Sequence, residues 1–127
     1  MLNKGIKNTI TINVTQDKTA KVMGSGTLDV FATPAMVALM EQTAAQSVQD
    51  LLDDGITSVG TKINVEHLSA DPVGIEVTCQ STLVEVDNRK LCFDIVVSDK
   101  HGIVGKAYHE RFLIKSESFM AKTNAKL

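Results

Sequence analysis

The chain of 127 residues is long enough for one domain with a working hydrophobic core and too short for two. Its 13 basic and 15 acidic residues form no block of like charge, which argues against nucleic acid or an anionic membrane as a partner. No apolar stretch reaches the length of a membrane span and the first residues lack the apolar core of a signal peptide, so we expect a soluble cytoplasmic protein.

The first half of the chain contains the main helical pattern. Alternating polar and apolar residues predict a strand over residues 9–14, and residues 20–25 could form a second, short strand. Residues 33–53 then predict a long helix that contains no glycine, and proline only at its start. Residues 35–40 are apolar on nearly all sides of this helix, so we expect a sheet to wrap around it.

Glu41 stands apart from the polar stripe of this helix. Its neighbours three and four positions away are Val37, Ala38, Ala44 and Ala45. A carboxylate in an apolar stripe costs free energy unless it is paired, hydrogen-bonded or facing a pocket, which makes Glu41 a candidate functional residue. The alternative is a structural glutamate at the seam that extends to water or pairs with a core partner.

The second half of the chain predicts a sheet. Four strand-like segments, at residues 57–68, 75–86, 90–98 and 103–114, are separated by turn residues. One long helix followed by an antiparallel meander is an α+β plan in a single domain, 1–127, with residues 116–127 as a partly ordered tail. A single-layer sheet leaves its edges exposed, so we expect the chain to self-associate.

The two cysteines, Cys79 and Cys92, lie on predicted consecutive strands joined by a turn near Asp87. If Val86 and Arg89 close this hairpin, the two thiols do not face each other, so we expect free buried thiols. No CxxC motif and no Cys/His cluster with zinc spacing is present, so the sequence predicts no metal site.

His67 is the second polar residue on an apolar face. Strand alternation places it with Ile63 and Val65, on the side that should meet the helix. His67 and Glu41 therefore point toward the same seam, as an acid–base pair would require. The alternative is a core histidine whose hydrogen bonds are satisfied.

Thr33 and Gly60 each allow a structural and a functional interpretation. Thr33 precedes Pro34, as an N-cap does, but a hydroxyl at a helix start could also hold or attack a carbonyl. Gly60 could mark a strand bulge or a point where a backbone N–H approaches a ligand oxygen, as in an oxyanion hole.

Six segments stand out together along the chain: Val30-Phe31-Ala32-Thr33-Pro34, Met40-Glu41, Ser58-Val59-Gly60-Thr61, Val65-Glu66-His67-Leu68-Ser69-Ala70, Pro72-Val73-Gly74 and His109-Glu110-Arg111-Phe112. In order and spacing they resemble the fluoroacetyl-CoA thioesterase-like family of hotdog-fold proteins, over most of residues 20–115. The resemblance implies a long helix wrapped by an antiparallel sheet, and a homodimer that joins two sheets edge to edge.

The resemblance also implies an activity. The family's catalytic set falls on Thr33, Glu41 and His67, and its substrate-binding positions fall on Gly60 and Arg111. The implied reaction is hydrolysis of an acyl-CoA thioester, with no cofactor apart from the CoA that is part of the substrate. Fluoroacetate-specific members carry lid phenylalanines where this chain has residues 24–29 without an aromatic, so we expect a general short-chain or aromatic acyl group.

Two other functions remain open at this point. The same fold could bind acyl-CoA without turnover, or could hydrate an enoyl thioester, although the Asp-x4-His pair of such hydratases is missing at the helix entrance.

Thr33 and Glu41 are eight residues apart, about 12 Å along a helix axis. Either the ligand spans this gap or Thr33 of one subunit meets Glu41 and His67 of its partner. The resemblance implies a pocket at a dimer interface, so we expect the second arrangement.

Overall fold

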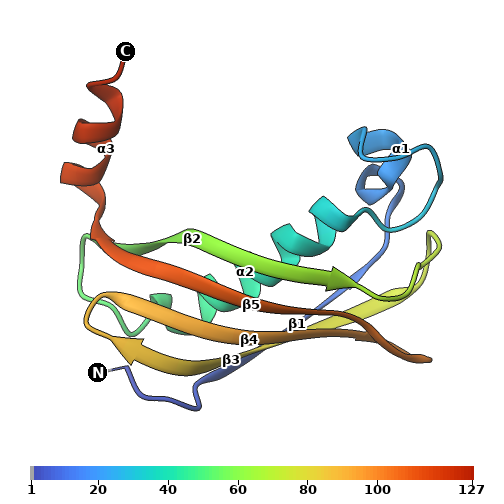
Figure 1. Cartoon of the computed structure of the whole chain (residues 1–127), viewed down its shortest axis with the longest axis horizontal. Coiled ribbons are helices and arrows are strands. Elements are labelled where there is room, and N and C mark those ends of the chain that lie inside the picture. Colours follow the sequence, from blue (N-terminus) through green and yellow to red (C-terminus); the bar gives the residue numbers. More distant parts are fainter. Residues whose placement is uncertain (1) are drawn as a thin grey trace.

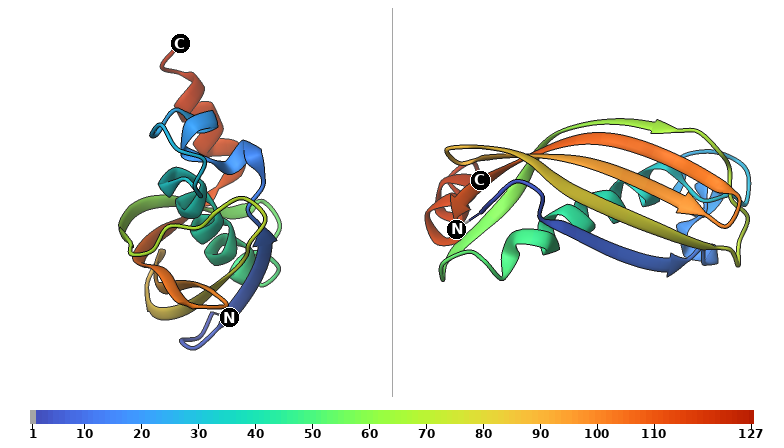
Figure 2. Two further views of the ribbon diagram at one scale, coloured as in Figure 1. Left: turned by 90° about the vertical axis from the view of Figure 1, so that its right-hand side faces the viewer. Right: turned by 90° about the horizontal axis from the view of Figure 1, so that it is seen from below.

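The structure is a computed structural model that describes residues 2–127. One curved antiparallel sheet, with strand order β1-β3-β4-β5-β2, forms a trough around helix α2 (Figures 1 and 2). The elements are β1 (Lys7–Asn13), η1 (Gln16–Lys18), α1 (Ala20–Met23), α2 (Thr33–Gln49), β2 (Ile56–His67), β3 (Glu76–Asp87), β4 (Lys90–Asp99), β5 (Gly102–Lys115) and α3 (Ser116–Asn124).

This architecture confirms the predicted α+β plan, with two differences in the elements. The short strand expected at residues 20–25 is wrong, because Thr19 caps a helical turn by accepting a hydrogen bond from the Val22 N–H, and Gly24 ends that turn at φ 78°. The four later strands do not form a simple meander. Strands β3, β4 and β5 are consecutive neighbours, but β2 pairs with β5 at one edge and β1 pairs with β3 at the other.

The core lies between α2 and the concave face of the sheet. Its largest buried side chains include Met36 and Met40 from the helix and Leu83, Phe93 and Ile95 from the strands. The sheet does not cover α2 on every side as expected. Pro34 and Ala38 are exposed and Val37 and Ala45 are half-buried, so one long side of the helix is open in the single chain.

Strand β2 contains a β-bulge that changes which residues face the helix. Gly60 pairs with Arg111 and Lys62 pairs with Glu110, so Thr61 is an extra residue in the ladder. Before the bulge the inward positions are Ser58 and Gly60; after it they are the odd-numbered ones, which end at His67. The bulge therefore lets glycine and histidine share the inner face.

The hairpin between β3 and β4 is closed by Asp87 and Lys90, one residue away from the pair that the sequence suggested. Cys79 pairs with Val97 and Cys92 pairs with Glu85 across the ladder. Both thiols are buried and free, which confirms the prediction that they do not face each other.

The ends of the trough differ. Helix α1 lies at one end and α3 extends from the other, beyond the β2 edge (Figure 1). We expected residues 116–127 to be a partly ordered tail, but residues 116–124 form α3, which has no buried residue. No helix in the described part of the chain is long and apolar enough to cross a membrane.

Candidate active site

The start of α2 is held in place by the segment before it. The Phe31 N–H donates to the Asp71 carbonyl (2.8 Å), and the Ala32 N–H donates to the Lys18 carbonyl (2.9 Å). Ala32, rather than the expected Thr33, is the N-cap residue, and it makes no side-chain cap bond. Thr33 is instead the first helical residue, so its hydroxyl is not needed for capping.

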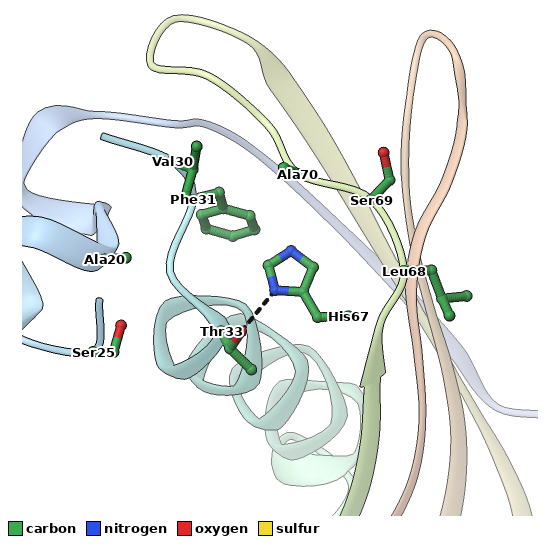
Figure 3. Close-up of a pocket in the computed structure, with 9 residues that line it drawn as sticks. All are labelled: Ala20, Ser25, Val30, Phe31, Thr33, His67, Leu68, Ser69 and Ala70. Atoms are coloured by element: carbon green, nitrogen blue, oxygen red, sulfur yellow. Dashed lines mark hydrogen bonds between the residues drawn. The ribbon is translucent and has the colours of Figure 1, made fainter. Parts of the chain in front are cut away.

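The hydroxyl of Thr33 bonds to a histidine from the end of β2. Thr33 Oγ1 lies 2.8 Å from His67 Nδ1. The dashed line in Figure 3 marks this hydrogen bond. Phe31 packs edge-on to the imidazole, with ring centroids 6.2 Å apart and planes at 80°. A hydroxyl paired with an imidazole nitrogen at this distance is the geometry of a nucleophile, or of a hydroxyl that orients water, with its base.

His67 is suited to act in its neutral form. Burial lowers the pKa of His67, an effect opposed in part by the backbone of Ser69. Its Nε2 atom is buried and has no hydrogen-bond partner among the described residues. When Nδ1 accepts the Thr33 proton, the ring proton lies on Nε2, which is then free to donate to a ligand.

These residues line an open cavity of about 300 Å³ at the α1 end of the trough. Its walls combine apolar side chains with the Thr33–His67 pair and the hydroxyls of Ser25 and Ser69 (Figure 3). The lining residues are Ala20, Ser25, Val30, Phe31, Thr33, His67, Leu68, Ser69 and Ala70. A concave, mostly apolar site with a few convergent polar groups is typical of a small-molecule site.

Glu41 lies in a second polar group, further along α2. Its Oε2 atom is 4.0 Å from Arg111 Nη1. A Cβ atom added at Gly60 would lie 2.8 Å from the same oxygen, so only glycine leaves room for the carboxylate there. The Glu41 side chain is 42% exposed, and of its apolar helical neighbours only Ala44 is buried.

Arg111 is the buried member of this second group, with 7% of its surface exposed. Its Nε donates to Ser58 Oγ (2.7 Å), and its Nη2 donates to the Ser58 carbonyl (2.9 Å). Its Nη1 donates to His109 Nε2 at 3.2 Å. Burial lowers the pKa of Arg111, and Glu41 opposes this shift.

The structure therefore brings the predicted residues together in two groups instead of one. Thr33 meets His67 in the same chain, which corrects the expectation that Thr33 pairs with His67 of a partner. Glu41 was expected beside His67, but it lies instead with Gly60 and Arg111. Between Thr33 and Glu41 the helix rises about 12 Å, since each residue adds about 1.5 Å.

Sequence reasoning missed two members of the second group, Ser58 and His109. His109 shares a face with Arg111 by strand alternation, which was a usable signal. Ser58 could be placed beside Arg111 only with the register of β2 on β5. Across residues 2–127, no cluster of three or more His, Cys, Asp or Glu residues is placed to hold a metal ion.

Comparison with known proteins gives a consistent match. Residues 14–117 match the family described as fluoroacetyl-CoA-specific thioesterase. The fluoroacetyl-CoA thioesterase of Streptantibioticus cattleyicolor is 38% identical over 98 residues, which cover 77% of this chain and 70% of that protein.

Solved structures agree with this match. A structure of the fluoroacetyl-CoA thioesterase superposes with a TM-score of 0.95 at 32% identity, covering 100% of this chain and 98% of the other. Variants of that enzyme have been solved in complex with fluoroacetate and CoA, and with acetyl-CoA. A hot-dog-like protein from Thermanaerovibrio acidaminovorans, at 21% identity, has a TM-score of 0.91 over 99% of this chain and 93% of its own. The fold is the hotdog fold.

Proposed function

The chain belongs to the fluoroacetyl-CoA-specific thioesterase family, and we propose that it hydrolyses an acyl-CoA thioester to the free acid and CoA through Thr33, Glu41 and His67. The observation that carries this proposal is the 2.8 Å contact between Thr33 Oγ1 and His67 Nδ1 at the cavity. Acyl-CoA is the substrate, and no cofactor beyond its own CoA is required.

The first step uses His67 as a general base. Neutral His67 accepts the Thr33 proton through Nδ1 while the hydroxyl oxygen, or a water that it orients, attacks the thioester carbonyl. The C–S bond then breaks, and the CoA thiolate takes up a proton as it leaves. If Thr33 itself attacks, a water molecule hydrolyses the resulting ester in a second step, with His67 again as the base.

In this proposal the second group, which contains Gly60, Arg111 and Glu41, binds the substrate and stabilises the transition state. The Gly60 N–H and Arg111 bind the substrate and the developing oxyanion, and Glu41 orients the attacking water or shuttles a proton. Glu41 can take this role because its side chain is partly exposed at the open side of α2.

We propose that a homodimer brings the two groups together in one site. Strand β2 lies at the edge of the sheet and pairs with β5 on one side, and α2 is open on one side in the single chain. Antiparallel pairing of β2 with β2 of a second copy, centred on Asn64 and with Thr61 again as the extra residue, sets Gly60 of one chain opposite His67 of the other. Glu41 of one subunit then completes the active site that contains Thr33 and His67 of its partner.

The acyl group in this proposal is a short-chain or aromatic one. Residues 24–29 contain no aromatic side chain, and of the group only Ser25 lines the cavity. Leu28, the one large apolar residue in this stretch, is 66% exposed. We therefore propose a thioesterase without selectivity for fluoroacetyl groups. We also propose, as the sequence led us to expect, that it acts in the cytoplasm.

Release of free CoA thiol from a panel of acyl-CoAs tests this function. Thr33→Ala and His67→Ala should each lower kcat/KM by about 10²-fold or more, as loss of a general acid–base group typically does. Thr11→Ala and His101→Ala, at exposed positions away from the cavity, serve as matched controls and should retain activity. Acyl-CoA binding without thiol release would identify a binding domain instead.

A further inference from the structure

His109 is a buried histidine outside the Thr33–His67 pair, and both of its ring nitrogens are engaged. It lies on β5 with 1% of its surface exposed. Nδ1 is 2.8 Å from the Lys62 carbonyl, and Nε2 is 3.2 Å from Arg111 Nη1. We propose that His109 is a positioning residue, which holds Arg111 and the β2 bulge in the geometry that the reaction needs. This proposal rests on the proposed thioesterase function.

The two contacts define the protonation state of this ring. A guanidinium has only donors, so Nε2 must accept from Arg111 and carries no proton. Nδ1 therefore carries the proton and donates it to the Lys62 carbonyl. A neutral imidazole in one tautomer satisfies both partners, whereas a protonated ring would turn an N–H toward the N–H groups of Arg111.

The contact to Lys62 fixes the bulge. Thr61 is the extra residue there, and its hydroxyl donates to the Glu110 carbonyl at 3.2 Å. The Lys62 carbonyl comes directly after Thr61 and accepts from His109 within the sheet interior. Bulged backbone has fewer ladder bonds than regular strand, so a side chain that bonds it replaces part of the missing restraint.

The contact to Arg111 directs the guanidinium. Ser58 accepts from Nε and Nη2, and His109 accepts from Nη1, so the plane of the guanidinium is fixed from both sides. Nη1 is also the atom that lies 4.0 Å from Glu41 Oε2. Removal of the His109 acceptor would free Nη1 to follow Glu41, or to turn away from it.

The ring also forms part of the wall around Gly60. A Cβ atom built at Gly60 would be 3.2 Å from His109 Cε1 and 3.3 Å from Arg111 Nη1. Phe93 packs on the far side of the imidazole, with ring centroids 6.2 Å apart. Phe93 on one side and two hydrogen bonds along its edge hold the ring in one orientation.

The charges around His109 make its neutral form dependent on pH. Burial lowers its pKa and the Arg111 charge adds to this, while the Lys62 carbonyl and the carboxylates of Glu41 and Glu110 oppose it. Protonation in acid would break the bond from Arg111 Nη1. The acid limb of the kcat/KM profile should therefore contain a contribution that disappears when position 109 cannot titrate.

Amide side chains can replace the two contacts of His109 one at a time. The Gln oxygen reaches the place of Nε2 and can accept from Arg111, whereas the Asn nitrogen reaches the place of Nδ1 and can donate to Lys62. His109→Phe keeps the volume and loses both contacts. We expect His109→Phe to lower kcat by about 10- to 100-fold with KM changed less, because a misplacement of about 1 Å costs up to 10²-fold.

The partial replacements make this proposal falsifiable. His109→Gln should restore most of kcat and lose the acid-limb contribution, and His109→Asn should restore it less. His101→Gln, the same change at an exposed turn position, is the control that should leave kcat unchanged. Wild-type kcat and an unchanged pH profile in both His109→Phe and His109→Gln would overturn the proposal.

A readout that needs no activity separates this inference from the proposed function. Amide hydrogen exchange at Gly60 and Thr61 should be faster in His109→Phe and His109→Gln than in His109→Asn, which keeps the bond to the bulge. If the protein hydrolyses no acyl-CoA, this exchange pattern still tests the positioning of the bulge. Equal exchange in all three variants and the wild type would exclude it.

Discussion

Gly60→Ala is the substitution for which the geometry gives the clearest expectation. No positive φ occurs at this glycine, so the backbone accepts alanine without strain. The added methyl, however, would lie 2.8 Å from Glu41 Oε2 and 3.2 and 3.3 Å from atoms of His109 and Arg111. At 2.8 Å one partner must move, and the partly exposed Glu41 can move most easily.

Gly60→Ala should lower the activity more than it lowers the stability. Overpacking typically destabilises by about 1–3 kcal/mol, and the lower end applies because the Glu41 carboxylate can turn toward solvent. Moving that carboxylate and covering the Gly60 N–H should lower kcat/KM by about 10²- to 10³-fold, the effect of losing an oxyanion donor. Thiol release from an acyl-CoA and urea unfolding measure the two effects on one preparation.

Gly102→Ala is the matched control, with the opposite expected profile. A Cβ atom there would meet nothing within 4 Å, but φ is +139°, which an L side chain rarely adopts. This variant should lose about 1–2 kcal/mol of stability and keep its kcat/KM. Wild-type kcat/KM in Gly60→Ala would refute the assignment of Gly60 and Glu41 to the site.

The subunit arrangement and one buried carboxyl give the remaining predictions. Mixing Glu41→Ala protein with His67→Ala protein under subunit exchange should restore thiol release, because one hybrid site is intact; full inactivity after demonstrated exchange would contradict a shared site. Mixing Thr33→Ala with His67→Ala should restore nothing, since these two residues serve the same site from one chain; recovery of activity would show otherwise. Burial and the nearby Asp99 carboxyl raise the pKa of Asp71 to about 7, so the folded state holds a proton that the unfolded state has lost above about pH 4. Stability should therefore fall as pH rises from about 4 to 7, and Asp71→Asn should flatten that fall in urea unfolding; an unchanged slope would argue against the shift.

The sequence allowed prediction of those parts of the site that depend on local periodicity. His67 could be assigned to the inner face because the residues from Ile63 onward alternate regularly. The helix start at Thr33 followed from Pro34, although the capping position belongs to Ala32. These features are set by neighbours within a few residues, so one sequence is enough to predict them.

The pairings within the site could not be predicted in this way. Thr33 and His67 are 34 residues apart, and their contact depends on how β2 is placed against the start of α2. Glu41 and His67 were both expected at the seam between helix and sheet, but Glu41 lies beside Gly60 and Arg111 whereas His67 lies beside Thr33, further toward the start of the helix. Arg111 meets Ser58 only in the observed register of β2 on β5, which periodicity alone does not define.

The extra residue in β2 has a consequence for how this protein can vary. Gly60 and His67 are seven positions apart, an odd interval that an uninterrupted strand would place on opposite sides. Deleting Thr61 would complete the ladder and give a more regular strand, but it would turn the imidazole outward, away from Thr33. A chain without that one residue could thus fold as well as this one, or better, and be inactive. Among its relatives, the count of residues between the glycine and the histidine should be a better guide to activity than overall identity.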